Sequence, residues 1–146
     1  MISYLTDMDG VLHREGEIIP GAKEFIGALR SEDIDFMVLT NNSIQTPRDL
    51  SAKLKRMGLD IEPERIWTSA TATAKFLSQQ AGDASAYVIG EAGLTTALHE
   101  IGWILTDADP DFVVLGETRT YSFEALTTAS NLIRSGSRFI ATNPDL

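Results

Sequence analysis

The 146-residue sequence contains no cysteine, which excludes disulfides, thiolate zinc sites and thiol catalysis. Basic residues are also few: 12 Lys and Arg stand against 21 Asp and Glu, so the formal net charge is −9. Such an acidic chain is poorly suited to nucleic acid or to an anionic membrane, and we expect neither partner. No apolar run approaches the roughly 18 residues of a membrane span, and the N-terminus lacks a signal-peptide pattern. We therefore expect a cytoplasmic protein.

Short runs of β-branched and aromatic residues alternate with longer segments of helical period. This alternation is typical of α/β folds, in which right-handed helical crossovers join parallel strands. Strands are predicted at 2–6, 34–40, 64–68, 84–89, 111–115 and 138–142, with helices at 20–30, after 46, after 68, near 94–101 and at 123–134. A polar break around Gly82 separates two blocks, residues 1–80 and 81–146. Because the sequence stops directly behind a strand, we expect a piece of a longer protein.

Two carboxylates, Asp7 and Asp9, stand at the end of the first predicted strand, and Gly10 follows them. In open α/β sheets, ligands bind at the carboxyl ends of the strands. Residues two apart share one face of a regular strand, whereas a turn would bring one carboxylate and one main-chain carbonyl towards a cation. Asp-Gly behind a strand is also an ordinary turn signal, so this motif alone leaves a plain turn and a ligand site open.

A second polar cluster, Thr40, Asn41, Asn42 and Ser43, follows the next strand along the chain. Its hydroxyls, amides and main-chain N–H groups suit the oxygens of a phosphoryl group, although the same residues are common in loops and helix caps. If the two strands are parallel neighbours, both clusters lie at the same sheet edge. Their joint occurrence favours a phosphate site over two unrelated turns.

Several stretches match one known pattern, in order along the chain. They are DMDGVL (7–12), PGA (20–22), LTNNS (39–43), TSA (68–70), YVIGE (87–91), PDFVVLGETR (110–119) and ATNPD (141–145). On these stretches the chain resembles the haloacid dehalogenase superfamily, and more narrowly its NagD-like and p-nitrophenyl-phosphatase-like branch. The resemblance implies a Rossmann-like parallel-sheet core with an α/β cap inserted after the third core strand. Residues 1–80 would then be the first half of the core, and residues 81–146 part of the cap.

The resemblance also implies a role for each residue of the two clusters. Asp7 would be the nucleophile that forms an aspartyl-phosphate, and Asp9 the general acid and base. The Asp7 carboxylate and the Asp9 main-chain carbonyl would hold Mg²⁺. Thr40 and Asn41 would bind the phosphoryl group, and Asn42 would contact the substrate. The resemblance thus implies a Mg²⁺-dependent phosphatase acting on a small phosphorylated metabolite.

Two motifs of the family pattern have no match in this chain. The family carries a phosphate-stabilising Lys and a second acidic motif, GDxxxTD-like, on core strands behind the cap, and neither has a match here. We therefore expect this chain alone to be a weakly active fragment. Without the strand behind the cap, the first strand has an open edge, which predicts self-association. For Arg119, Asn143 and Asp145, in the cap segments, a substrate-side role and a structural role stay open.

The alternative from another class is a non-catalytic phosphate-binding module, or a phospho-acceptor of the receiver kind. A receiver takes its phosphate on an Asp behind the third strand, where this chain has Thr68 and Ser69, so the receiver interpretation is disfavoured. Which phosphoester is the substrate does not follow from the sequence, because cap loops set specificity in the family.

Overall fold

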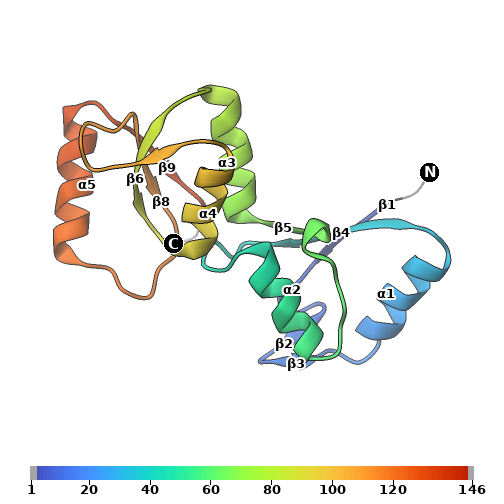
Figure 1. Cartoon of the computed structure of the whole chain (residues 1–146). Coiled ribbons are helices and arrows are strands. Elements are labelled where there is room, and N and C mark those ends of the chain that lie inside the picture. The colour runs from blue at the N-terminus through green and yellow to red at the C-terminus, as the bar shows by residue number, and fades with distance from the viewer. Residues whose placement is uncertain (1–2, 145–146) are drawn as a thin grey trace. The chain divides into compact units, whose positions relative to one another are not determined.

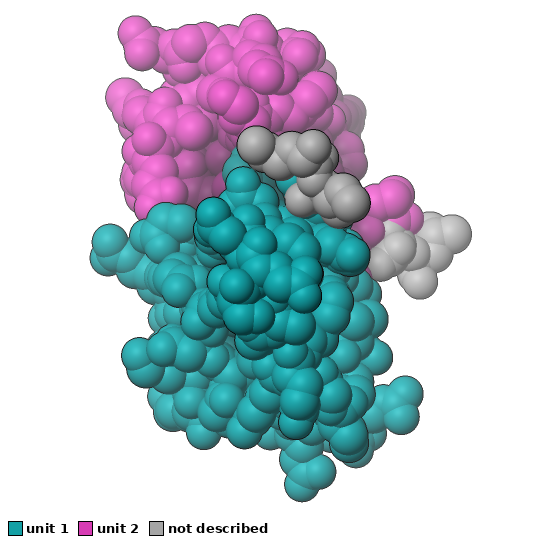
Figure 2. All heavy atoms as spheres, turned by 90° about the vertical axis from the view of Figure 1, so that its right-hand side faces the viewer, with its two compact units in different colours: residues 1–40, 47–68 teal, residues 41–46, 69–146 magenta. Residues whose placement is uncertain are grey.

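The computed structural model describes residues 3–144, in which helices alternate with short parallel strands (Figure 1). Contacts divide the chain into two compact units (Figure 2): unit 1 comprises residues 1–40 and 47–68, and unit 2 comprises residues 41–46 and 69–146. Within residues 3–144, none of the helices combines the length and the apolar character that a membrane span requires.

Unit 1 is built on a three-stranded sheet in the order β1-β4-β5, beside a small antiparallel hairpin of β2 and β3. Its elements are β1 (Ser3–Asp7), β2 (His13–Arg14), β3 (Glu17–Ile18), α1 (Ala22–Ser31), β4 (Asp35–Thr40), α2 (Pro47–Arg56), the 3₁₀ helix η1 (Pro63–Arg65) and β5 (Ile66–Thr68). All three strands of the sheet are parallel, with Asp7 opposite Leu39 and Thr40 opposite Thr68. The carboxyl ends of β1 and β4 therefore lie at the same edge.

The core of unit 1 is formed by apolar residues that recur with helical or strand period. Helix α1 buries Ala22, Ile26 and Leu29 on one face, and β4 buries Phe36 and Val38. This spacing puts the apolar residues of each element on the side that packs against the other.

Strand β1 is less well covered than β4, because it occupies the edge of its sheet and pairs with β4 alone among the described residues. Leu5 is 71% exposed and Tyr4 contacts Phe25 edge to face. The self-association expected from an open edge stays a prediction. Sedimentation velocity at rising protein concentration tests it, and a sedimentation coefficient that stays at the monomer value would contradict it.

Unit 2 holds a four-stranded parallel sheet in the order β7-β6-β8-β9. Its elements are α3 (Ser69–Gln80), β6 (Ser85–Ile89), α4 (Ala92–Glu100), β7 (Ile104–Leu105), β8 (Phe112–Leu115), α5 (Phe123–Ser135) and β9 (Arg138–Ala141). Helices α3 and α4 pack on one face of the sheet and α5 on the other (Figure 1). Val113 and Val114, neighbours on β8, are both fully buried because they point to opposite covered faces.

The α/β class with parallel sheets, predicted from the sequence, is confirmed, and so are the strands and helices it named, within two or three residues. The strand expected at 64–68 is shorter, since its first two residues belong to η1, which begins at Pro63. The hairpin β2–β3 and the two-residue β7 were not predicted. The division at residue 80 stays a prediction about the family's core and cap, while contacts group α3 with unit 2. Ile2 and Asp145 lie outside the described residues.

Candidate active site

Asp7 is the last residue of β1, and its side chain is exposed at the carboxyl edge of the sheet. The next residue, Met8, is buried and anchors the chain there. The Met8 N–H is shared between the Leu39 carbonyl oxygen, at 3.0 Å, and Asp7 Oδ1, at 2.8 Å. One oxygen of the Asp7 carboxylate is thus fixed by the main chain, while the group as a whole stays accessible to a ligand.

Asp9 lies in a tight turn behind β1, not on the strand itself. The Met8 carbonyl oxygen accepts hydrogen bonds from the N–H groups of Leu12, at 3.0 Å, and His13, at 3.3 Å. Gly10, whose N–H donates to the His13 carbonyl oxygen at 2.8 Å, has a φ of +80°. A side chain would strain that left-handed conformation, so the glycine permits the turn. Of the two geometries left open by the sequence, the turn is therefore the observed one.

The turn brings Asp9 against the end of the neighbouring strand. The buried hydroxyl of Thr40 donates a hydrogen bond to Asp9 Oδ2 at 3.1 Å. The two residues are 31 positions apart, and the parallel pairing of β1 with β4 brings them together. Asp7, Asp9 and Thr40 thus meet at one sheet edge, as the sequence predicted for parallel neighbouring strands.

The oxygen atoms at this edge suit a hard divalent cation. A carboxylate and main-chain carbonyls are the ligands that Mg²⁺ takes from proteins, and Mg²⁺ keeps several waters besides. The Asp7 carboxylate and the Asp9 carbonyl have that chemistry, so the residues present fit Mg²⁺. Within residues 3–144, no three His, Cys, Asp or Glu side chains are grouped as a metal cage. Among the described residues, these two groups are the ligands we assign, and water and phosphate oxygens would complete the coordination that this part of the chain provides.

The segment directly behind Thr40 is stabilised by its own side chains. Asn42 Oδ1 accepts hydrogen bonds from the N–H groups of Ile44, at 3.0 Å, and Gln45, at 2.8 Å. The Asn41 carbonyl oxygen accepts the Ser69 hydroxyl at 2.7 Å. In this structure the Asn42 amide oxygen thus shapes the loop, whereas the substrate contact expected of Asn42 stays a prediction.

Two residues of unit 2 outside this segment, Glu117 and Gly93, also hold it in place, and the sequence did not indicate this role for either of them. The buried Ser43 accepts the Glu117 N–H on its hydroxyl oxygen at 2.9 Å, and the Gly93 N–H donates to the Ile44 carbonyl oxygen at 2.8 Å. A Cβ on Gly93 would lie 2.6 Å from the carbonyl oxygens of Ser43 and Gln45. Only a glycine fits there. The one available signal was Gly93 itself, in the stretch GEAGL (90–94).

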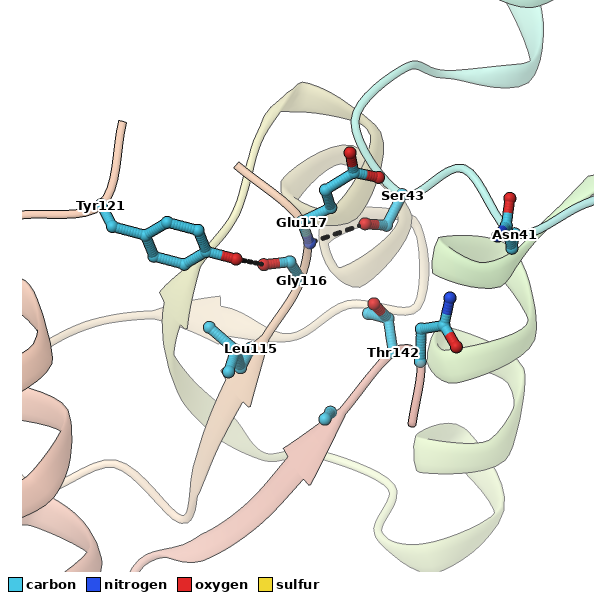
Figure 3. A pocket seen from close by; sticks show the side chains of 9 residues that line it. Asn41, Ser43, Leu115, Gly116, Glu117, Tyr121 and Thr142 are labelled. Carbon is cyan, nitrogen blue, oxygen red and sulfur yellow. Dashed lines mark hydrogen bonds between the residues drawn. The ribbon is translucent and has the colours of Figure 1, made fainter. Parts of the chain in front are cut away.

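A cavity of about 370 Å³, with both polar and apolar groups in its lining, lies in unit 2 beside this segment (Figure 3). It is lined by Asn41, Ser43, Leu115, Gly116, Glu117, Tyr121, Ala141, Thr142 and Asn143. The lining residues come from the segment 41–46 and from the carboxyl ends of β8 and β9, where ligands bind in parallel sheets. The Tyr121 hydroxyl is directed at the Gly116 carbonyl oxygen, 3.5 Å away. Asn143 lines the cavity and Arg119 does not.

Comparisons with known proteins agree with this arrangement. The sequence profile of the family described as haloacid dehalogenase-like hydrolase matches residues 4–104. The chain is 72% identical, over 145 residues, to dihydroxyacetone phosphatase of Corynebacterium glutamicum, covering 99% of this chain and 53% of that one. It is 41% identical to the ribonucleotide monophosphatase NagD of Escherichia coli K12, covering 98% and 57%.

Solved structures of similar proteins have the same fold. NagD from E. coli K-12 superposes with a TM-score of 0.92 at 40% identity, covering 98% of this chain and 57% of that one. A putative p-nitrophenyl phosphatase from Bacillus subtilis gives a TM-score of 0.89 at 38% identity, covering 98% and 56%. This chain therefore spans a little over half the length of the relatives it matches.

Proposed function

This chain belongs to the haloacid dehalogenase-like hydrolase family, and from that premise we propose that it carries the nucleophile of a Mg²⁺-dependent phosphomonoester phosphatase. The family predicted from the sequence is confirmed. The observation that carries the proposed activity is the meeting of Asp7, Asp9 and Thr40 at one sheet edge, with the Thr40 hydroxyl 3.1 Å from Asp9 Oδ2. These three residues would bring a nucleophile, a proton donor and a hydroxyl donor together at the carboxyl ends of β1 and β4.

The proposed reaction has two steps on the same two carboxyl groups. An oxygen of Asp7 attacks the phosphorus, and the bond from phosphorus to the leaving oxygen breaks while the Asp9 carboxyl gives its proton to that oxygen. In the second step the Asp9 carboxylate takes a proton from water, whose oxygen attacks the phosphorus and frees inorganic phosphate and Asp7. Mg²⁺, held by the Asp7 carboxylate and the Asp9 carbonyl, would reduce the repulsion between a carboxylate nucleophile and a phosphate dianion.

In this scheme the Thr40 hydroxyl has two possible hydrogen-bond acceptors, the Asp9 carboxylate and the phosphoryl group of the substrate. Its hydroxyl donates to Asp9 in the present structure, and the family resemblance gives the same hydroxyl to the phosphoryl group. A hydroxyl has one hydrogen to donate. The proposal therefore requires the Thr40 hydroxyl to turn from Asp9 to a phosphate oxygen when substrate binds, with the Asn41 N–H as a second donor.

We propose a small phosphomonoester as the substrate. Dihydroxyacetone phosphate is the first compound to test, because the relative that is 72% identical is a dihydroxyacetone phosphatase. Sugar phosphates and nucleoside monophosphates follow, since other relatives are an acid sugar phosphatase and a ribonucleotide monophosphatase.

The receiver-like alternative has little support in the geometry. Strand β5 is the third strand of the unit 1 sheet, and it ends at Thr68, whose side chain is buried. A receiver needs a carboxylate at that position, and Thr68 has none.

The test is phosphate release from dihydroxyacetone phosphate and p-nitrophenyl phosphate by this chain, with and without Mg²⁺. We expect slow, Mg²⁺-dependent release, because the second acidic motif and the Lys of the family have no match here. Asp7→Asn should abolish it, since the amide is a poor nucleophile, while Asp83→Asn, at an exposed residue of unit 2, should leave it unchanged. Release that Asp7→Asn leaves intact would refute Asp7 as the nucleophile, and no release at all would refute activity of this chain.

A further inference from the structure

His13 is a buried polar side chain that the proposed mechanism does not use. Only 4% of the residue is exposed, and neither ring nitrogen has a hydrogen-bond partner among the described residues. Its Nε2 nevertheless lies 3.3 Å from Oδ1 of Asp9. Burying an imidazole without a full hydrogen bond costs free energy, so the placement of this ring beside a carboxylate calls for a reason.

The backbone leaves this ring little freedom to move away. His13 opens β2, where it pairs with Ile18 of β3, and its own carbonyl oxygen accepts the Gly10 N–H at 2.8 Å. Its N–H donates to the Met8 carbonyl oxygen, and the preceding Leu12 is buried in the core of unit 1. The same turn that projects the Asp9 carboxylate thus also positions the imidazole against it.

The Asp9 carboxylate has a different neighbour at each oxygen. Oδ2 accepts the Thr40 hydroxyl at 3.1 Å, and Oδ1 faces His13 Nε2. About half of the Asp9 side chain, 52%, remains exposed. Two contacts on two oxygens define both the direction and the plane of a carboxylate, while the exposed part stays open to a ligand.

We propose that His13 is a positioning residue that holds the Asp9 carboxyl in the orientation needed for proton transfer, which rests on the proposed phosphatase function. When the Thr40 hydroxyl turns to the phosphoryl group, His13 is the contact that remains on Asp9. The contact needs a hydrogen on Nε2, which an imidazole can carry. The 3.3 Å separation is within hydrogen-bond distance, but the alignment of the ring N–H with Oδ1 is not that of a hydrogen bond. Catalytic hydrogen bonds that are poorly aligned in a free enzyme often form fully when substrate binds.

The role can be measured without any activity, on the Asp9 side chain of this chain in solution. Three-bond couplings from the Asp9 carboxyl carbon to its own backbone nitrogen and carbonyl carbon report the χ1 rotamer populations. All variants, the parent included, are compared in a Thr40→Val background, because without substrate the Thr40 hydroxyl would still hold Asp9 Oδ2. We expect one rotamer in the parent protein and in His13→Gln, whose amide N–H replaces Nε2–H. We expect averaged couplings in His13→Phe, which keeps a buried ring without a donor. His99→Phe, at an exposed residue of α4, is the matched control and should match the parent.

The leaving group supplies the kinetic test, because only a poor leaving group needs a proton from Asp9. His13→Phe should lower kcat/KM on an alkyl phosphate by roughly 10-fold to 100-fold, the scale of a misplaced catalytic group. This ratio covers the steps up to departure of the leaving group and so leaves out the later general-base step of Asp9, which both substrates share. On p-nitrophenyl phosphate, whose leaving group needs no proton, the loss should stay within about 3-fold. His13→Gln should recover most of the alkyl phosphate rate.

The outcomes separate the positioning role from the phosphatase proposal. A single unchanged Asp9 rotamer in His13→Phe, or equal losses on both substrates, would overturn the role of His13. Absence of phosphate release from the parent chain would instead refute the proposed activity, and the coupling measurement would still decide whether His13 orients Asp9.

Discussion

Both units contain a parallel sheet, but β1 of unit 1 and β8 of unit 2 differ in how well they are buried. In unit 2 the central strand β8 has helices over both faces, and Val113 and Val114 are fully buried. In unit 1 the strand that carries Asp7 lies at an edge, and Leu5, two residues before Asp7, is 71% exposed. Strand β1 therefore lacks the cover that β8 has in unit 2.

This difference separates where stability arises from where catalysis is expected. Buried apolar area and close packing stabilise a fold, whereas a nucleophile must be reachable by its substrate. Substitutions in the sheet of unit 2 should therefore lower stability, and substitutions at the end of β1 should mainly lower activity.

The largest effect among these predictions should come from a buried leucine that packs against the sheet of unit 2. Leu98 in α4 is completely buried, and Leu98→Ala should lower the free energy of unfolding by about 2–5 kcal/mol, because a cavity remains. Leu5→Ala, the same substitution on β1, should change it by less than about 0.5 kcal/mol. Urea unfolding followed by circular dichroism measures both. Equal losses at the two positions would contradict the contrast between the sheets.

Two Gly→Ala substitutions, one in each unit, should change the free energy of unfolding in opposite directions. Gly93→Ala places a Cβ 2.6 Å from two main-chain oxygens and should destabilise unit 2 by about 1–3 kcal/mol, since the backbone would have to shift. Gly27→Ala lies within α1 and meets no atom within 4 Å, so it should stabilise unit 1 by roughly 0.5–1 kcal/mol. Thermal melting compares the two variants with the parent. An unchanged melting temperature in Gly93→Ala would show that the backbone of segment 41–46 can shift at little cost, against this prediction.

The smallest predicted effect is on the pH dependence of stability, and it arises from Asp111, directly before β8. The Ser85 hydroxyl and the Ser85 N–H donate to Asp111 Oδ2 at 2.8 and 2.9 Å, and they hold the pKa of Asp111 below its ordinary value of 3.8. Because the folded protein favours the carboxylate, this stabilisation is complete above 3.8 and is lost as the pH falls through the lowered pKa.

Asp111→Asn should therefore lower the urea midpoint slightly at neutral pH, and the gap from the parent should narrow in acid below 3.8. Asp107→Asn, at an exposed residue four positions earlier, is the matched control. A gap that stays constant down to the acid end would mean that the hydrogen bonds from Ser85 do not favour the charged form.

The sheet-edge site was predictable because it depends on local patterns. Asp7 and Thr40 each end an apolar run, and parallel strands align their carboxyl ends, so their meeting follows from strand period and handedness. The open edge of β1 was expected on another ground: in the family a strand behind the cap pairs with the first strand, and that strand has no match in this chain. Residues whose neighbours are near in sequence, or whose strands pair in order, can be placed by such reasoning.

The rest depends on contacts that no short pattern encodes. Ser43 and Glu117 are 74 residues apart, and their hydrogen bond exists only because two loops of unit 2 converge. His13 sits beside the charged residues Arg14 and Glu15, so nothing local indicates its burial. A hairpin of two two-residue strands is likewise too short for an alternation of apolar and polar residues to show.

The most direct test of Asp7 as the nucleophile is to trap its phosphorylated form. Borohydride reduces an acyl phosphate to an alcohol, so an aspartyl-phosphate at position 7 becomes homoserine, which peptide mass spectrometry locates. The protein would be quenched with borohydride during turnover of p-nitrophenyl phosphate with Mg²⁺. Asp9→Asn should raise the yield, because the intermediate then lacks its general base. Homoserine at position 7 that depends on substrate is the expected result, whereas turnover with an unmodified Asp7 would contradict the proposed mechanism.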